Sequence, residues 1–309
     1  MKVLIIDEMH LSIIPLLENE GFEVDYNPEI KREEIMEIVH EYEGLIIRSK
    51  TPMDRPLLQK ATKLRFIGRA GAGLDKIDLE YLEERGIHLF HAAEGNKDAV
   101  GEQAIGMLLA LFNHIGKADR EVKKGIWKRE ENRGEELQGK TVGIIGYGNM
   151  GSAMAKKLTG FDVRILAYDK YKSGFGNEFV KETDFQSILE ESDIVSMHVP
   201  LTPETRNFFT LEVLKKFRKP IYLINTARGE IISFETLNQA LDQGILKGAV
   251  LDVLENEKFN TYSPEQKAEF SKMAARNNVI FSPHIAGWTH QSYIKINEVL
   301  VEKIRQSLN

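Results

Sequence analysis

Three polar residues stand shortly after apolar runs of the chain, and their types suit proton transfer on a small anionic molecule: Arg228, Glu257 and His284. Histidine titrates near neutral pH, so it can give or take an alcohol proton during hydride exchange with a nicotinamide. A neighbouring carboxylate orients the imidazole and raises its pKa, because it favours the charged form. An arginine holds a carboxylate and polarises the carbonyl beside it. Together the three residue types predict reduction of a 2-oxo acid.

Placement alone leaves alternatives open. His91, His198 and His290 lie at or near similar loop positions, and Glu255 competes with Glu257. A single histidine is more often structural than catalytic. The chemistry therefore depends on which of these side chains the fold brings together.

A glycine-rich turn, Gly146-Tyr147-Gly148-Asn149-Met150-Gly151, follows the apolar run Val142–Ile145 and precedes a helix-like segment. Asp169 closes the next apolar run, at about the 20-residue spacing of the dinucleotide-binding fingerprint. The glycines allow a tight turn, close approach of a pyrophosphate and close helix packing, and helix N–H groups face the phosphates. Asp169 is expected to bind ribose hydroxyls and repel a 2′-phosphate, which favours NAD over NADP. The alternative is an ordinary tight turn with a solvated Asp169.

Two further segments suit anions. Arg48, Ser49 and Lys50 follow one apolar run of the first ninety residues, and Gly71-Ala72 follows another. A guanidinium is well shaped for phosphate or carboxylate, and consecutive small residues expose backbone N–H groups that suit a carboxylate. The alternatives are a surface arginine and a tight turn.

The elements that position these residues follow an alternating pattern of short apolar runs and amphipathic segments. Such alternation predicts parallel sheets with helices on both faces, in which ligands bind at the carboxyl ends of strands. The first ninety residues predict strands at Lys2–Ile6, Phe22–Asp25, Gly44–Ile47, Phe66–Gly68 and Ile87–Phe90. They predict helices at Ser12–Glu20, Lys31–Glu41, Arg55–Lys60 and Leu79–Arg85.

A long apolar-rich helix is predicted over Asp98–Lys117, buried against more than one surface and linking two domains. The charged stretch Lys123–Glu136 is predicted to be an exposed excursion, in which Trp127 serves packing or a subunit contact.

The alternation continues beyond Asp169 and, with the two strands around the glycine turn, predicts about six strands of a doubly wound sheet. Further strands are predicted at Ile194–Val199, Ile221–Asn225, Ala249–Val253 and Val279–Ser282. Further helices are predicted at Asp184–Glu191, Leu211–Phe217, Phe234–Gln243, Pro264–Ala275 and Gln291–Leu308.

Composition narrows the class of protein. The 309 residues suffice for about two domains. A net charge of −6 gives no electrostatic reason to expect nucleic acid or an anionic membrane as partner. The absence of cysteine excludes disulfides, cysteine–zinc sites and a cysteine nucleophile, and no metal site is predicted. The sequence contains no run of about 18 apolar residues, so no membrane span is predicted and we expect a cytoplasmic protein.

Five segments resemble the D-isomer-specific 2-hydroxyacid dehydrogenases, most closely the phosphoglycerate dehydrogenases among them. These segments are Arg69–Asp75, Gly146–Gly151, His198–Thr202, Asn225–Gly229 and His284–Gly287. The resemblance covers nearly the whole chain. It implies an α/β fold in which a doubly wound (Rossmann) NAD domain, residues 98–287, is inserted in a flavodoxin-like substrate domain, residues 1–97 and 288–309.

The resemblance also implies roles for single residues. Arg228 binds substrate, His284 is the acid/base and Glu257 is its carboxylate partner, whereas formate dehydrogenases of this superfamily carry glutamine there. Gly71 and Ala72 supply backbone donors to the substrate carboxylate, and we expect Arg48 with Ser49 or Lys50 to bind a phosphate. The residues implied in NAD binding are the Gly146–Gly151 turn, Asp169, His198, Val199, Pro200, Thr226, Ala227 and Asp252, the last at the nicotinamide carboxamide.

The function expected from this resemblance is NAD-dependent interconversion of 3-phosphoglycerate and 3-phosphohydroxypyruvate in serine biosynthesis. The first alternative is a hydroxypyruvate, glyoxylate or other 2-oxo acid reductase. The second, of another class, is an NAD(H)-sensing binding protein like the corepressors of the superfamily. A homodimer through residues 98–136 is also implied.

The chain departs from the family pattern at a few places. Lys258 stands where proline usually follows the catalytic glutamate, and the stretch before Val279 is longer than typical, so the local path near Glu257 stays open. His91 stands where asparagine is common. Because the sequence stops at Asn309, we expect no C-terminal regulatory domain and no serine feedback through one.

Overall fold

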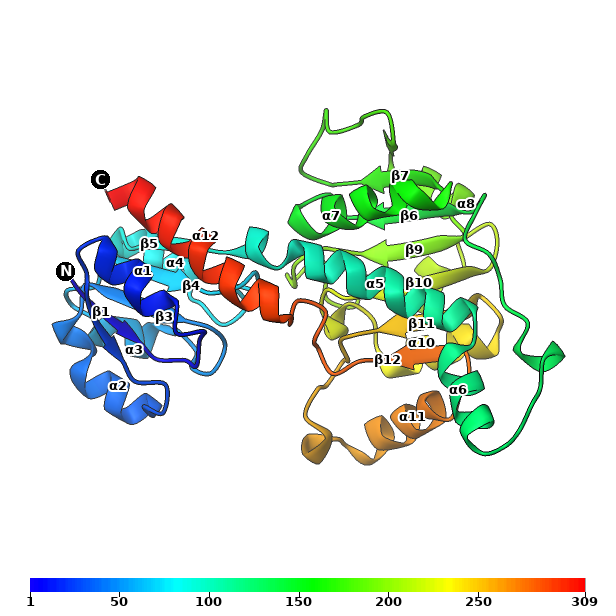
Figure 1. Cartoon of the computed structure of the whole chain (residues 1–309), viewed down its shortest axis with the longest axis horizontal. Helices are drawn as coiled ribbons and strands as arrows, with labels where there is room; N and C mark the ends of the chain where they lie inside the picture. Colours follow the sequence, from blue (N-terminus) through cyan, green and yellow to red (C-terminus); the bar gives the residue numbers. More distant parts are fainter. Residues whose placement is uncertain (309) are drawn as a thin grey trace. The chain divides into compact units, whose positions relative to one another are not determined.

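The computed structural model describes residues 1–308, which form two compact units (Figure 1). The first unit combines Met1–Lys97 with the chain from Trp288 onward. The second unit is the continuous segment Asp98–Gly287. Each unit is built around its own parallel sheet.

The sheet of the first unit has five parallel strands in the order β2-β1-β3-β4-β5. This order is flavodoxin-like. The strands are β1 (Lys2–Ile5), β2 (Glu23–Tyr26), β3 (Gly44–Ile47), β4 (Phe66–Arg69) and β5 (His88–His91). Each lies within one residue of its predicted bounds. The inner strands β3 and β4 are buried and therefore consist mostly of apolar residues, whereas the edge strands β2 and β5 are only partly buried.

Helices cover both faces of this sheet. Val3 and Ile5 lie in one core with α1 (Ile13–Asn19) and α12 (His290–Leu308), whereas Leu4 lies in the opposite core. The helices over that second face are α2 (Arg32–Ile38), α3 (Arg55–Lys60) and α4 (Leu79–Arg85). Short 3-10 turns occur at Val39–Glu41 and Ala93–Gly95.

The sheet of the second unit has seven parallel strands in the order β12-β11-β10-β9-β6-β7-β8. The strands are β6 (Thr141–Ile145), β7 (Arg164–Tyr168), β8 (Val180–Glu182), β9 (Ile194–Met197), β10 (Ile221–Asn225), β11 (Leu246–Leu251) and β12 (Val279–Phe281). The direction of winding reverses between β6 and β9, as in doubly wound dinucleotide-binding sheets. The prediction missed β8, an edge strand of three residues in which only Val180 is buried.

Two apolar cores cover the faces of this sheet. Val142 and Ile144 face α5 (Lys97–Phe112) and α7 (Asn149–Leu158), whereas Ile145 belongs to the other core. That core is completed by α8 (Phe185–Glu191), α9 (Leu211–Leu214), α10 (Phe234–Asp242) and α11 (Pro264–Ala274). Short 3-10 turns occur at Glu130–Asn132, Thr159–Phe161, Gly229–Ile231 and Phe259–Thr261.

The helix predicted over Asp98–Lys117 is two helices. α5 ends at Phe112, where the Asn113 side chain donates to the Leu109 carbonyl (3.0 Å) and His114 adopts a left-handed conformation with φ of 50°. α6 (Ile115–Lys123) then begins, and it has no buried residue. α5 itself is buried on most of its circumference, as predicted.

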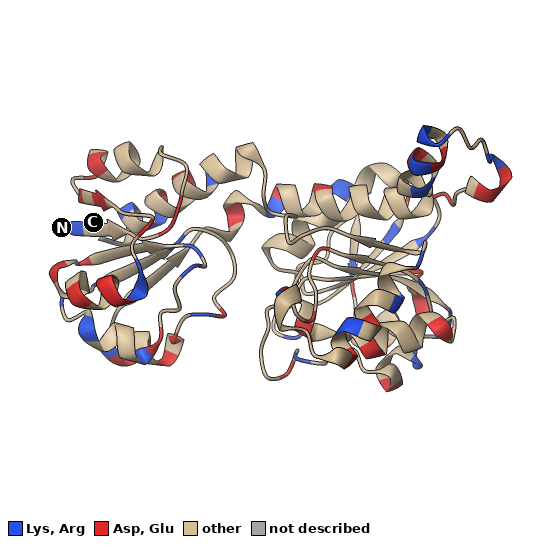
Figure 2. Cartoon of the chain, turned by 90° about the horizontal axis from the view of Figure 1, so that it is seen from below, with Lys and Arg blue, Asp and Glu red and all other residues tan. Residues whose placement is uncertain are grey.

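Acidic and basic residues lie interspersed over each unit (Figure 2). Among residues 1–308, no helix combines the length and the apolar character that crossing a bilayer requires.

Candidate active site

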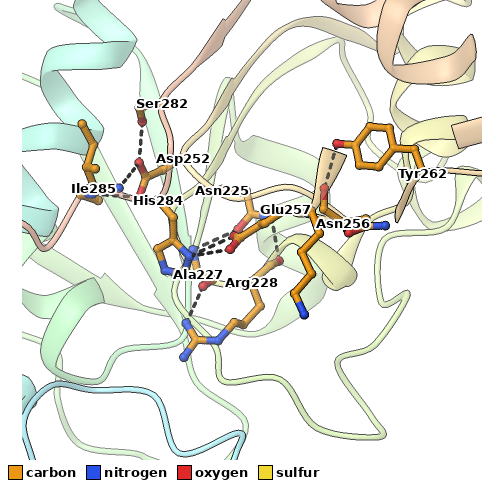
Figure 3. Close-up of polar contacts among 12 residues, drawn as sticks. Asn225, Ala227, Arg228, Asp252, Asn256, Glu257, Tyr262, Ser282, His284 and Ile285 are labelled. Carbon is orange, nitrogen blue, oxygen red and sulfur yellow. Dashed lines mark hydrogen bonds and ion pairs between the residues drawn. The ribbon is translucent and has the colours of Figure 1, made fainter. Parts of the chain in front are cut away.

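The loops after β10, β11 and β12 carry Arg228, Glu257 and His284, respectively. These strands are parallel neighbours, so their carboxyl ends meet at one edge of the sheet. Figure 3 shows the three side chains gathered there.

Gly229 lets the loop after β10 pack directly on the loop after β11. A Cβ atom on Gly229 would lie 1.8 Å from the carbonyl oxygen of Leu254, so no other residue fits without backbone movement. The fully buried Asn225 holds the same loop, because its side chain accepts from the Ala227 N–H (3.0 Å) and donates to the Arg228 carbonyl (2.9 Å). Arg228 is therefore presented by a backbone with little freedom to shift.

Asp252 holds the turn that carries His284. Its buried carboxylate accepts hydrogen bonds from the Ser282 hydroxyl and from the backbone N–H groups of Ile285 and Ala286 (2.9 Å each). The His284 N–H donates to the Asp252 carbonyl (2.7 Å). These bonds over-determine the turn and hold His284 at a φ of 56°, a left-handed conformation that is costly for a residue with a side chain. The family resemblance implied that Asp252 binds the nicotinamide carboxamide. It did not indicate that Asp252 also holds the turn of His284.

His284 and Glu257 form a hydrogen-bonded ion pair. The imidazole Nδ1 lies 2.9 Å and 3.1 Å from the two carboxylate oxygens, and both side chains are about half exposed. The bond to Glu257 raises the pKa of His284; burial and the Arg228 charge oppose that rise, and the Asp252 charge supports it. With Nδ1–H directed at Glu257, Nε2 stays available for proton transfer.

The competing side chains have other contacts. The Glu255 carboxylate accepts the N–H of Phe234 at the start of α10 (2.7 Å). His198, after β9, bonds the Ser196 hydroxyl (2.8 Å), and burial lowers its pKa to about 4, so it is neutral at pH 7. Burial also lowers the pKa of His91, on an edge strand of the first unit, and His290 begins α12. The geometry therefore favours Glu257 and His284.

The glycine turn after β6 fits a dinucleotide. Gly146 has a φ of 91°, and a Cβ there would lie 2.6 Å from the His198 carbonyl; a Cβ on Gly151 would lie 2.0 Å from the Gly146 carbonyl. A Cβ on Gly148, by contrast, would meet nothing within 4 Å. The first and third glycines are thus required by packing, and the second leaves open space at the start of α7, where a pyrophosphate is expected.

The other predicted cofactor residues border this turn or follow the neighbouring strands. Asp169, after β7, accepts the backbone N–H groups of Tyr147 (2.8 Å), Tyr171 (3.0 Å) and Lys172 (3.1 Å). His198, Val199 and Pro200 follow β9, and Thr226 and Ala227 follow β10. The Thr226 hydroxyl oxygen is buried and has no hydrogen-bond partner in the part of the chain that the structure describes.

Arg48 lies after β3 of the first unit within an aromatic cage. Its guanidinium stacks on Trp288 (4.0 Å to the ring centroid), lies 5.4 Å from the Tyr293 ring and donates to the Glu8 carbonyl (3.1 Å). Burial lowers the pKa of Arg48, but a guanidinium remains charged in proteins. Lys50 is directed elsewhere, because its ammonium donates to the carbonyls of residues 28 and 30.

The turn after β4 contains Gly71 and Ala72 and is shaped by Arg69. The Arg69 guanidinium donates to the carbonyls of Ala70 (2.5 Å) and Gly73 (2.9 Å), and a Cβ on Gly71 would lie 1.9 Å from it. Gly71 accordingly has a φ of 139°. Ile47 pairs with Arg69, so the Arg48 and Gly71 segments leave neighbouring strands at the same edge, next to exposed Ser49. No pattern in the sequence indicates this organising role of Arg69.

Comparison with known proteins identifies the family. Residues 105–286 match the model of the D-isomer specific 2-hydroxyacid dehydrogenase, NAD binding domain. The chain is 35% identical to D-3-phosphoglycerate dehydrogenase of Archaeoglobus fulgidus over 98% of its length, but it spans about half of that relative (56%). It is also 35% identical to hydroxypyruvate reductase of Thermotoga maritima, with 95% of this chain and 93% of the relative covered.

Solved structures agree with this grouping. The crystal structure of D-lactate dehydrogenase from Aquifex aeolicus, complexed with NAD and lactic acid, superposes with a TM-score of 0.83 at 26% identity, covering 100% of this chain and 95% of that one. The likeness extends over both units. The chain, with its NAD-binding domain, belongs to the D-isomer-specific 2-hydroxyacid dehydrogenase family.

Proposed function

We propose that the chain is an NAD-dependent D-2-hydroxyacid dehydrogenase whose substrate pair is 3-phosphoglycerate and 3-phosphohydroxypyruvate, the serine-pathway reaction. The observation that carries the dehydrogenase assignment is the His284–Glu257 pair held at the same sheet edge as Arg228. This set supplies a proton donor, a group that tunes it and a cation for an oxo acid.

Each residue of the set has a role in the proposed reaction. Arg228 binds the substrate carboxylate and polarises the adjacent carbonyl. Protonated His284 donates its Nε2 proton to the carbonyl oxygen during reduction and takes it back during oxidation. Glu257 fixes the imidazole orientation and keeps it protonated to higher pH. A nicotinamide dinucleotide held at the Gly146–Gly151 turn and by the residues after the neighbouring strands would supply or accept the hydride.

Arg48 is proposed to bind the phosphate together with Ser49, and the backbone N–H groups of Gly71 and Ala72 to bind the carboxylate. Stacking on Trp288 leaves the edges of a guanidinium able to donate in its plane, and one nitrogen of the Arg48 guanidinium donates to the Glu8 carbonyl. Lys50 does not take part in this phosphate site, because its ammonium donates to the carbonyls of residues 28 and 30.

A hydroxypyruvate or glyoxylate reductase is the second candidate. One observation supports it: the hydroxypyruvate reductase relative and the phosphoglycerate dehydrogenase relative are equally similar to this chain, at 35% identity each. The same catalytic set serves both reactions, so the phosphate site decides between them.

We also propose a homodimer formed through residues 98–136. α6 and the segment after it expose large apolar side chains: Ile115 (54%), Val122 (52%) and Trp127 (77%). Large exposed apolar side chains are typical of a protein interface when they lie together on the surface.

The test compares wild type with Arg48→Ala in NADH oxidation, using phosphohydroxypyruvate, hydroxypyruvate and glyoxylate at matched concentrations. We expect Arg48→Ala to lower kcat/KM about 100-fold for the phosphorylated acid, about 2.7 kcal/mol, and only a few-fold for glyoxylate. Lys50→Ala is the matched control and should leave the ratio between substrates unchanged.

Equal losses of kcat/KM on both kinds of substrate would contradict the phosphate site at Arg48 and favour a general 2-oxo acid reductase. Absence of turnover with all of them would contradict an enzyme and favour a dinucleotide-sensing binding protein.

A further inference from the structure

Glu257 lies in the irregular loop between β11 and α11, and its side chain has little to hold it. Among the described residues, its carboxylate is hydrogen-bonded to His284, and it is about half exposed. A flexible, half-exposed glutamate loses side-chain entropy when it is fixed. The position of the carboxylate therefore depends on how firmly the loop backbone is fixed on either side of it.

The residue before Glu257 fixes that backbone. The Asn256 side-chain oxygen accepts the N–H of Lys258 (2.9 Å), so one side chain spans Glu257 and closes a turn around it. The Asn256 amide donates to the Thr261 hydroxyl (3.0 Å). The Tyr262 hydroxyl donates to the Asn256 carbonyl (2.8 Å), as Figure 3 shows.

Tyr262 is in turn anchored in the core of the unit. Its ring lies 5.7 Å from Phe234 of α10 and 5.8 Å from Phe270 of α11, and Phe270 lies 5.8 Å from Phe281 of β12. β12 leads directly to the turn that carries His284. Burial, with the negative charges of Glu255 and Glu257, raises the pKa of Tyr262, so its hydroxyl stays a donor at neutral pH.

We propose that Asn256 and Tyr262 are positioning residues that hold Glu257 against His284 and thereby set the pH range in which His284 is protonated. Neither residue touches His284. The inference rests on the proposed function, because it assigns to these two residues the tuning of the acid that the function requires.

The other charged groups that face His284 have separate supports. Arg228 is presented by the loop that Asn225 holds, and Asp252 is fixed by Ser282 and two backbone N–H groups. Loss of the Asn256–Tyr262 contacts therefore changes the Glu257 contribution alone. Glu257 raises the pKa of His284, so weakening their contact lowers it toward or below the value of a free histidine.

The experiment measures the pH profile of kcat/KM for reduction in wild type, Tyr262→Phe, Asn256→Ala and Glu257→Gln. Reduction needs protonated His284, so the rate falls as pH rises through its pKa. In Tyr262→Phe and Asn256→Ala we expect this fall at lower pH, toward the Glu257→Gln profile. A shift of about one unit gives about tenfold loss above the wild-type pKa and almost none well below both.

Two variants separate positioning from general damage. Asn256→Ser keeps a neutral acceptor for the Lys258 N–H and should restore part of the wild-type profile without adding a charge near His284. Tyr222→Phe, which removes a hydroxyl bonded to Glu135 at the opposite end of β10, should leave the profile unchanged. Tyr262→Phe keeps the ring in its aromatic cluster, so the protein remains folded if Asn256→Ala does not.

NMR titration of the His284 imidazole without substrate gives the same midpoint independently of turnover. An unchanged midpoint in Tyr262→Phe and Asn256→Ala, beside a lowered midpoint in Glu257→Gln, overturns the positioning role. If Glu257→Gln also leaves the midpoint unchanged, the failure lies in the proposed His284–Glu257 function and the positioning role falls with it.

Discussion

Four acidic residues that follow strands of the second unit have four different uses. Asp252 is saturated by a hydroxyl and two N–H groups, Glu255 caps α10, Asp169 accepts N–H groups beside the glycine turn, and Glu257 alone bonds an imidazole. Residue type and strand ends are visible in a sequence, but direction within a loop is not. That is why residue type and placement alone left Glu255 and Glu257 as competitors, and only the family resemblance favoured Glu257 before the structure.

Replacement of Asp169 should change the preference between cofactors. Asp169→Asn keeps an acceptor for the Tyr147 N–H but removes the negative charge that repels a 2′-phosphate. We expect the ratio of kcat/KM for NADPH over NADH to rise about tenfold, equivalent to about 1.4 kcal/mol. Steady-state rates with both cofactors measure it. An unchanged ratio would show that Asp169 does not face the ribose.

The strands and helices show which parts of the fold the hydrophobic pattern of the sequence predicts and which parts it does not. Apolar runs such as Leu45–Ile47 located nearly every strand, because both faces of these sheets are buried. The helical pattern of α5 continues through Asn113 and His114, so the break there, which depends on a left-handed His114, was invisible. β8 has only one buried residue, so its sequence contains no apolar run from which the strand could have been predicted. Likewise, the hydrogen bonds of Asn256 and Arg69 depend on loop paths that no periodicity encodes.

The close contact between the loops after β10 and β11 predicts that only glycine is tolerated at position 229. Gly229→Ala places a Cβ 1.8 Å from the Leu254 carbonyl, so one loop must move. We expect destabilisation of about 1–3 kcal/mol and a Tm lower by several degrees. kcat/KM should fall as well, because Arg228 moves with the loop.

Gly160→Ala is the matched control, since a Cβ there would meet nothing within 4 Å. Thermal unfolding and steady-state rates measure both variants. A wild-type Tm and rate for Gly229→Ala would mean that the loops separate easily and do not fix the site.

At the level of the whole protein, the apolar residues on and after α6 predict a self-association surface. Trp127→Ala should weaken the proposed dimer by about 30-fold or more in Kd, because a buried interface tryptophan contributes about 2 kcal/mol or more. Sedimentation over a range of protein concentrations measures this. Leu79→Ala, also at an exposed apolar residue, serves as control. A wild-type protein that sediments as a monomer would contradict the dimer itself.

The first unit draws its sheet from the start of the chain and one of its covering helices from the end. Val3 and Ile5 of β1 share a core with Leu300, Val301 and Ile304 of α12. During synthesis, β1 leaves the ribosome before the second unit and α12 leaves after it, because the second unit is one uninterrupted segment between them. The second unit can therefore complete its core while the first still exposes an apolar face to the cell. The sheet of the first unit therefore gains its α12 covering only after about 190 intervening residues have been synthesised, and during that interval this face of the sheet lacks one of its covering helices.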